Sequence, residues 1–116
     1  MHEMALTKDI VDTVLEYVQR AEAKRVHAVY LRIGYARDVV DELLQSCFTY
    51  YARGTQAEGA QLVVWRVPVT MRCNACGCVF PINLNNRSTW VCPSCGAHDY
   101  RSNTGMEFMI DRIEVA

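Results

Sequence analysis

Apolar residues recur at helical spacing near the start of the chain. Between Met4 and about Ala23 they form one stripe, made of Leu6, Ile10, Val14 and Val18 with Val11, Leu15 and Ala21 beside them. This period predicts an amphipathic helix with a single apolar face. Thr7 is a candidate N-cap, because its hydroxyl can accept a backbone N–H. The residues that precede Met4 then lie just before the helix or in its first turn.

The next stretches predict a strand, a helix and a second strand. The segment 26–33 is rich in β-branched and aromatic residues and places Val29, Leu31 and Ile33 on one face. After Asp38 the helical period returns, in Val40, Leu43, Leu44, Cys47, Phe48 and Tyr51, and it ends before Gly54. The segment 61–67 is the second strand candidate, stopped by Pro68. On this pattern Cys47 is interpreted as a small buried core residue and not as a ligand or nucleophile.

The periodicity disappears from Val69 to about Ser102, where Cys, Gly, Asn, Pro and Ser dominate. Such a stretch predicts a loop-built module held by something other than a hydrophobic core. The segment 106–115 then predicts a third strand, with Phe108 and Ile110 on one face. We therefore expect an α+β fold, an α/β sandwich with two helices on one face of a small three-stranded mixed sheet. Residues 1–68 and 103–116 would form this helix and sheet domain, and residues 69–102 the inserted module.

Composition narrows the function classes. A chain of 116 residues suits one small domain plus a metal-stapled module. The net charge of -1 lacks the basic excess that phosphate contacts require, so nucleic acid is not an expected partner. Since no apolar run is long enough to span a bilayer and the acidic start does not resemble a signal peptide, we expect a cytoplasmic protein without a membrane anchor. A reducing compartment leaves thiols available for metal.

Four of the six cysteines have the spacing Cys73-x2-Cys76-x15-Cys92-x2-Cys95. A glycine follows each pair and permits a tight turn around the sulfurs. Four thiolates complete a tetrahedral zinc shell without an open position, so the prediction is a structural zinc module resembling a zinc ribbon. A one-iron electron-transfer site has the same spacing and remains an alternative. Other candidates nearby or elsewhere are Cys78, which either packs or competes for metal, and His98 and His27, which are interpreted as surface and structural residues.

The sequence begins Met1-His2-Glu3, which offers an amine, an imidazole and a carboxylate on consecutive residues. The Met1 amine and the His2 backbone nitrogen can close a five-membered chelate ring on a metal, and the imidazole of His2 closes a six-membered ring. Glu3 can add its backbone nitrogen or its carboxylate. This nitrogen-rich set suits Ni(II) or Cu(II). The signal is weak when taken alone, because a disordered terminus can begin with the same residues.

The chain resembles the hydrogenase maturation nickel-binding proteins of the HypA/HybF family. The resemblance rests on the Met1-His2-Glu3 start, the strand end Ile33-Gly34, the segment Glu58-Gly-Ala-Gln-Leu62, both cysteine pairs and the closing Ile110-Asp-Arg-Ile-Glu. It implies a nickel metallochaperone with Met1, His2 and Glu3 at the nickel and Cys73, Cys76, Cys92 and Cys95 at the zinc. It also implies a maturation GTPase of the HypB type and the large subunit of a nickel-iron hydrogenase as partners, with a homodimer and a service to urease left open. Some relatives carry histidines beside the cysteine pairs, where this chain has Gly77 and Gly96.

The sequence gives less support to two other classes of function. A zinc-ribbon interaction module that binds nucleic acid or protein is the alternative, although the nearly neutral charge disfavours nucleic acid. An enzyme is not expected, because the sequence offers no nucleophile paired with a base, no phosphate loop and no open metal site.

Overall fold

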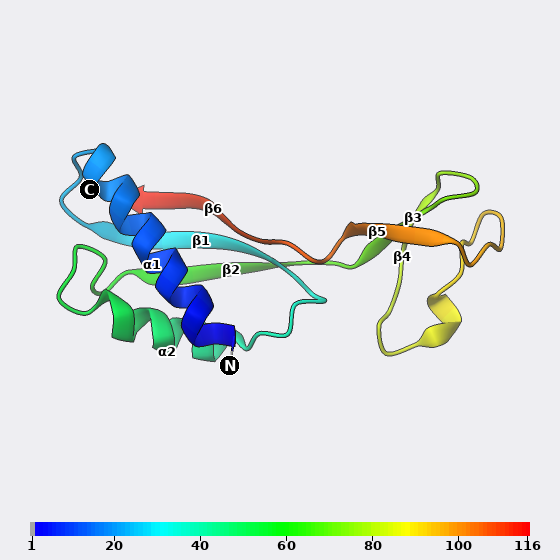
Figure 1. The fold of residues 1–116 in the computed structure, drawn as a ribbon, viewed down its shortest axis with the longest axis horizontal. Coiled ribbons are helices and arrows are strands. Elements are labelled where there is room, and N and C mark those ends of the chain that lie inside the picture. The colour runs from blue at the N-terminus through cyan, green and yellow to red at the C-terminus, as the bar shows by residue number, and fades with distance from the viewer. Residues whose placement is uncertain (1) are drawn as a thin grey trace. The chain divides into compact units, whose positions relative to one another are not determined.

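The structure, a computed structural model, describes His2 to Ala116, and of His2 it describes the backbone alone. Helices and strands follow one another as Figure 1 shows. Their bounds are α1 (His2–Arg20), β1 (Val26–Gly34), α2 (Asp41–Ala52), β2 (Gln61–Val67), β3 (Thr70–Cys73), β4 (Val79–Pro81), a 3-10 turn η1 (Arg87–Thr89), β5 (Tyr100–Thr104) and β6 (Phe108–Val115).

The chain divides into two compact units. The first consists of Met1–Arg32, Asp38–Trp65 and Met109–Ala116, and the second of Ile33–Arg37 and Arg66–Phe108. The first unit contains both α-helices, whereas the second contains β3, β4 and β5. The functional division made from the sequence, with nickel on residues 1–68 and 103–116 and zinc on 69–102, stays a prediction.

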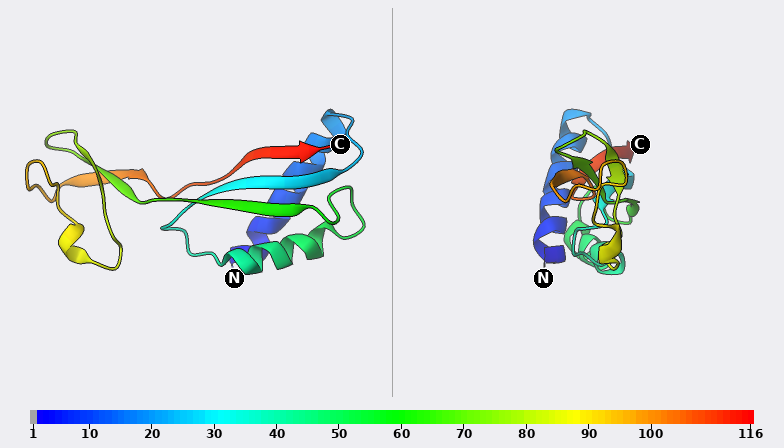
Figure 2. Two further views of the ribbon diagram at one scale, coloured as in Figure 1. Left: turned by 180° about the vertical axis from the view of Figure 1, so that it is seen from behind. Right: turned by 90° about the vertical axis from the view of Figure 1, so that its right-hand side faces the viewer.

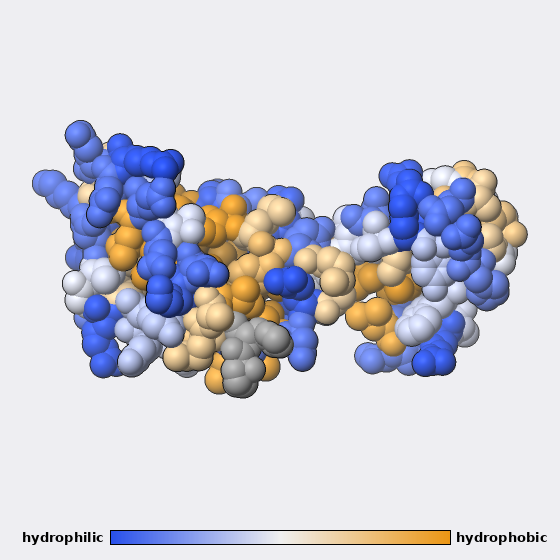
Figure 3. All heavy atoms as spheres, in the orientation of Figure 1, coloured by the Kyte–Doolittle hydropathy of each residue, from blue (hydrophilic) through white to orange (hydrophobic). Residues whose placement is uncertain are grey.

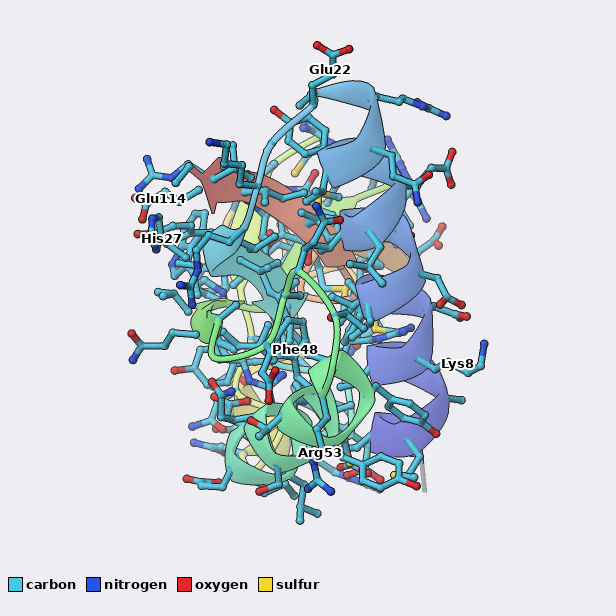
Figure 4. All side chains as sticks on the ribbon, turned by 90° about the vertical axis from the view of Figure 1, so that its left-hand side faces the viewer. Lys8, Glu22, His27, Phe48, Arg53 and Glu114 are labelled. Carbon is cyan, nitrogen blue, oxygen red and sulfur yellow. The ribbon has the colours of Figure 1, made fainter. Side chains whose placement is uncertain are left out.

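The first helix, α1, buries the stripe that its period predicts. Ile10, Val11, Val14 and Val18 are each at most 4% exposed. Thr7, however, is not an N-cap, because α1 begins at His2 and the Thr7 hydroxyl donates to the carbonyl of Glu3 at 2.6 Å. Figure 4 shows Lys8 pointing from the opposite side of α1 into solvent. In the described part of the chain, no helix is long and apolar enough to cross a membrane.

The second helix, α2, packs against α1 along a narrower stripe than the sequence pattern suggests. Leu44, Phe48 and Ala52 are fully buried, and Figure 4 shows Phe48 on the inner side of the unit. Leu43 is 46% exposed and Cys47 is half-buried. Since successive helical residues are rotated by about 100°, these two lie at the edge of the buried stripe. The interpretation of Cys47 as a core residue is therefore wrong.

A mixed three-stranded sheet in the order β2-β1-β6 lies beside the helices. Backbone bonds at both ends of β1 show the directions. Lys24 donates to Ala116 and Gly34 to Glu107, which is the antiparallel sense, whereas Val26 donates to Gln56 and Tyr35 to Val67, which is the parallel sense. The α+β fold predicted from the sequence, with its three strands and two helices, is confirmed.

The two faces of this sheet differ. Val29 and Leu31 of β1, at most 1% exposed, belong to the core. The alternate residues carry polar groups. Arg32 pairs with Asp111 at 2.9 Å, and its guanidinium lies 5.0 Å from the centre of the Trp65 ring. One face of the strands therefore supplies the core and the other remains polar and aromatic.

The second unit contains a sheet that the sequence pattern did not predict. It has the order β4-β3-β5, with both pairs antiparallel. The prediction of a loop-built module was wrong in this respect. Strands of three to five residues are too short for a visible alternation of apolar and polar residues, which is why the pattern failed here. Figure 2 shows these strands and their connecting loops from two further directions.

Candidate metal centres

The four cysteines of the two pairs converge in the second unit. Their sulfur atoms all lie within 4.8 Å of one another, and the Cys73–Cys95 and Cys76–Cys92 sulfur pairs are each 3.6 Å apart. A tetrahedron of sulfurs around zinc, with metal–sulfur bonds of about 2.3 Å, has edges of about 3.8 Å. The cluster therefore has the donor set and nearly the dimensions of a four-thiolate metal site.

Each cysteine pair forms the same turn. Gly77 donates to the carbonyl of Cys73 and Gly96 to that of Cys92, both at 2.9 Å, and both glycines have φ near +78°. A side chain at that φ is strained, which explains a glycine after each pair. The Ala75 N–H also points at the Cys73 sulfur, 3.3 Å away. Two matching turns thus present their sulfurs to one point.

The inner sulfurs are supported by a small apolar cluster. Cys73 and Cys92 are each 1% exposed and share this cluster with Phe80. Tyr100 packs against it, with its ring edge-on to Phe80 at 5.7 Å between centroids. Cys76 and Cys95 are exposed. Two ligands are therefore anchored in a core, while the other two leave the site open to solvent on one side.

The thiols of Cys73, Cys92 and Cys95 differ in acidity. The backbone N–H of Cys76 lowers the pKa of Cys73. Burial raises the pKa of Cys92, but the N–H groups of Cys95 and Ser94 outweigh it, so that this pKa falls to about 6. The Ala97 N–H lowers the pKa of Cys95, whereas the Cys73 thiol, burial and the two other thiols of the cluster raise it to about 12. Because gathered thiolates repel one another, ionising all four requires a cation among them.

The additional candidates lie outside this cluster of four. Cys78 is half-buried against the Phe80 cluster and donates to the carbonyl of Val79, and burial raises the pKa of its thiol. It therefore packs, which is one of the two roles that its sequence position left open. His98 and His27 are both exposed. The structure brings neither histidine into the described group of sulfurs.

The N-terminal candidates are described in part. Met1 lies outside the described residues, and His2 belongs to the first turn of α1. Glu3 is 7% exposed, and its Oε2 accepts a hydrogen bond from the Val40 backbone N–H at 2.9 Å. The carboxylate thus joins the first turn of α1 to the residue before α2. No local signal in the sequence indicates this bond, because its partner is 37 positions away.

The chain matches a known protein family over almost its whole length. The family described as "Hydrogenase/urease nickel incorporation, metallochaperone, hypA" matches residues 1–115. The hydrogenase maturation factor HypA of Geobacter sulfurreducens is 39% identical over 115 residues, covering 99% of both chains, and that of Dehalococcoides mccartyi is 33% identical, covering 99% of this chain and 94% of the relative.

Two solved structures share the fold. A solution structure of a HypA protein has a TM-score of 0.79 at 21% identity, covering 100% of this chain and 97% of the other. The solution structure of the nickel metallochaperone HypA from Helicobacter pylori has a TM-score of 0.67 at 19% identity, covering 97% and 96%. Since the family profile covers nearly the whole chain and relatives exceed 30% identity, this chain belongs to the HypA family of nickel-incorporation metallochaperones, which are not enzymes.

Proposed function

We propose that this chain carries Ni(II) on the donors of Met1, His2 and Glu3 and delivers it during the maturation of a nickel-iron hydrogenase. A structural zinc on Cys73, Cys76, Cys92 and Cys95 holds the second unit together. The observation that carries the proposal is the family match from residue 1, which includes the three N-terminal donors. Delivery takes place in the cytoplasm, where a reducing environment keeps the four thiols available to zinc.

The position of the N-terminal donors supports the nickel part. The first N–H groups of an α-helix have no intrahelical acceptor, and those of His2 and Glu3 belong to the first turn of α1. Their nitrogens can therefore bind a metal without breaking the hydrogen-bond ladder of the helix. The Glu3 carboxylate, which bonds to Val40, anchors this turn to the rest of the first unit. In this proposal Glu3 gives the nickel its backbone nitrogen while its side chain positions the turn.

The geometry of the sulfur cluster supports the zinc part. Four thiolates at nearly tetrahedral spacing fill the shell of a zinc ion, which has no further ligand position to offer a substrate. Iron is the alternative metal for such cysteine pairs, and metal analysis of the purified protein distinguishes it from zinc. Because the small second unit has few buried apolar side chains, zinc binding would supply much of its folding free energy.

The proposed partners follow from the family. We propose that the chain acts together with a maturation GTPase of the HypB type. The large subunit of a nickel-iron hydrogenase would accept the nickel. Sedimentation of the zinc-loaded protein would distinguish a monomer from a homodimer. Co-purification of the tagged large subunit with this chain, in the presence and absence of nickel, tests the delivery step.

The decisive experiment measures zinc and nickel in untagged protein. We expect one tightly held zinc per chain and one nickel that a chelator removes. His2→Ala should lose the nickel and keep the zinc, whereas the control His27→Ala, which removes an exposed histidine of β1, should bind both metals like the unmodified protein. Nickel binding that survives His2→Ala would contradict the proposal, as would iron in place of zinc.

A further inference from the structure

A cysteine and a methionine from different helices meet in the first unit. The Cys47 thiol of α2 donates to the Met4 thioether of α1, with the two sulfur atoms 3.3 Å apart although 43 residues separate them in sequence. This pair is distinct from the four-cysteine cluster, and its donors differ from the nitrogen and oxygen donors at the start of the chain. It places two soft sulfur ligands within one metal's reach.

The backbone of both residues is held in place by contacts of the two helices. The Thr7 hydroxyl, itself fully buried, lies 2.6 Å from the Glu3 carbonyl and 3.1 Å from the Met4 carbonyl, which fixes the backbone of Met4. On α2, Phe48 next to Cys47 is fully buried in the core. The Glu3 to Val40 hydrogen bond ties the beginnings of the two helices together. Helix packing therefore brings the backbones of Met4 and Cys47 close enough for their sulfurs to meet.

The pair is accessible from solvent. Met4 is 42% exposed and Cys47 is half-buried. Figure 3 shows apolar residues at the surface where both helices begin, and two of those nearby in the chain, Val40 and Leu43, are 48% and 46% exposed. An ion can thus reach the sulfurs, while the apolar surroundings limit competition from water and hard oxygen ligands.

We propose that Met4 and Cys47 form a binding site for one Cu(I) ion. Thiolate and thioether sulfurs are the soft ligands that Cu(I) selects over Zn(II) or Ni(II) sites built from nitrogen and oxygen. On binding, the Cys47 thiol releases its proton to solvent, and the sulfurs form bonds to the ion without any change in oxidation state. The sulfurs must move apart to admit the ion, because two metal–sulfur bonds span more than their 3.3 Å contact, and the flexible thioether of Met4 permits this movement.

The test uses the full chain with its zinc bound, under anaerobic conditions, and Cu(I) supplied from its bicinchoninate complex. Copper retention, zinc release to an indicator dye and the methyl resonances of isotopically labelled methionine are followed together. We expect one Cu(I) per chain to bind before zinc is released and the Met4 methyl resonance to shift. Met4→Leu should weaken this binding by about tenfold or more, and Cys47→Ser should abolish it.

Matched variants control for the remaining sulfurs. Cys78→Ser and Met106→Leu, which alter a half-buried thiol and an exposed thioether of the second unit, should leave the first Cu(I) equivalent unchanged. If circular dichroism shows that Cys47→Ser folds poorly, the Cu(I) affinity of Met4→Leu still tests the site, because leucine conserves the volume of methionine. Equal Cu(I) affinity in Met4→Leu, an unshifted Met4 methyl, or zinc displacement by the first equivalent of copper would each overturn the proposal.

Discussion

The carboxylate of Glu3 accepts a 2.9 Å hydrogen bond from the backbone N–H of Val40, the residue that precedes α2. Val40 provides no side-chain cap, so this helix lacks the usual Ser, Thr, Asp or Asn at its start. A carboxylate near a helix N-terminus is also favoured by the helix dipole. One acidic residue therefore serves the packing of two helices beside the proposed nickel donors.

Replacing Glu3 should reveal this structural role. Glu3→Ala removes the acceptor of the part-buried Val40 N–H, and we expect the free energy of unfolding to fall by about 2 kcal/mol. Glu3→Gln keeps an acceptor without the charge and should cost about half as much. Urea unfolding followed by the far-ultraviolet circular dichroism of the helices measures both. If Glu3→Ala is as stable as the parent protein, the bond to Val40 does not stabilise the helix pair.

The four-cysteine cluster predicts a local dependence on zinc. Cys73→Ala or Cys92→Ala removes a buried thiolate, so the second unit should lose zinc and unfold while the helices of the first unit keep their circular dichroism signal. Cys78→Ala, which removes a nearby thiol outside the cluster, should retain a full equivalent of zinc. Unchanged zinc content in both of the first two variants would rule out this ligand set.

The nickel proposal predicts that the chain end is itself a ligand. A free α-amine has a pKa of about 7.7 to 8.0 and binds a metal only when deprotonated, so nickel affinity should rise with pH through this range. One glycine added ahead of Met1 abolishes the five-membered chelate ring and should weaken nickel binding sharply without affecting zinc. Nickel titrations at several pH values compare the two proteins. Equal affinity and equal pH dependence would move the site to the side chains alone.

A close backbone contact in the second unit predicts an intolerance to one added methyl group. A Cβ on Gly34 would lie 1.9 Å from the carbonyl carbon and oxygen of Gly105. Because neither backbone can retreat cheaply, Gly34→Ala should destabilise by about 3 kcal/mol. Gly54→Ala is the control, since its Cβ meets nothing within 4 Å and only its φ of +77° is unfavourable, which costs about 1 to 2 kcal/mol. Thermal unfolding measures the loss of stability in both variants. A larger loss in Gly54→Ala than in Gly34→Ala would contradict the prediction.

Local periodicity was sufficient to predict much of the fold. The stripe Ile10, Val14 and Val18, the strand 61–67 and the alternation around Val29 and Leu31 involve neighbours in sequence, and the structure confirms them. The same reasoning failed for Thr7, because capping depends on where the helix begins, and the helix begins at His2. It failed again for β3, β4 and β5, whose residues are too few to establish a period.

For the candidate metal sites as well, local features could be predicted from the sequence and long-range contacts could not. The sequence by itself identified the four cysteines that converge in the structure, because paired spacing and the glycines at positions 77 and 96 are local requirements of a tight turn. Only the tertiary structure decided that the Glu3 carboxylate bonds to Val40 and that the Cys47 thiol meets Met4. Both contacts depend on how α1 packs against α2. Packing of this kind arises from apolar faces distributed over many residues, so no short stretch of sequence specifies which two side chains it brings together.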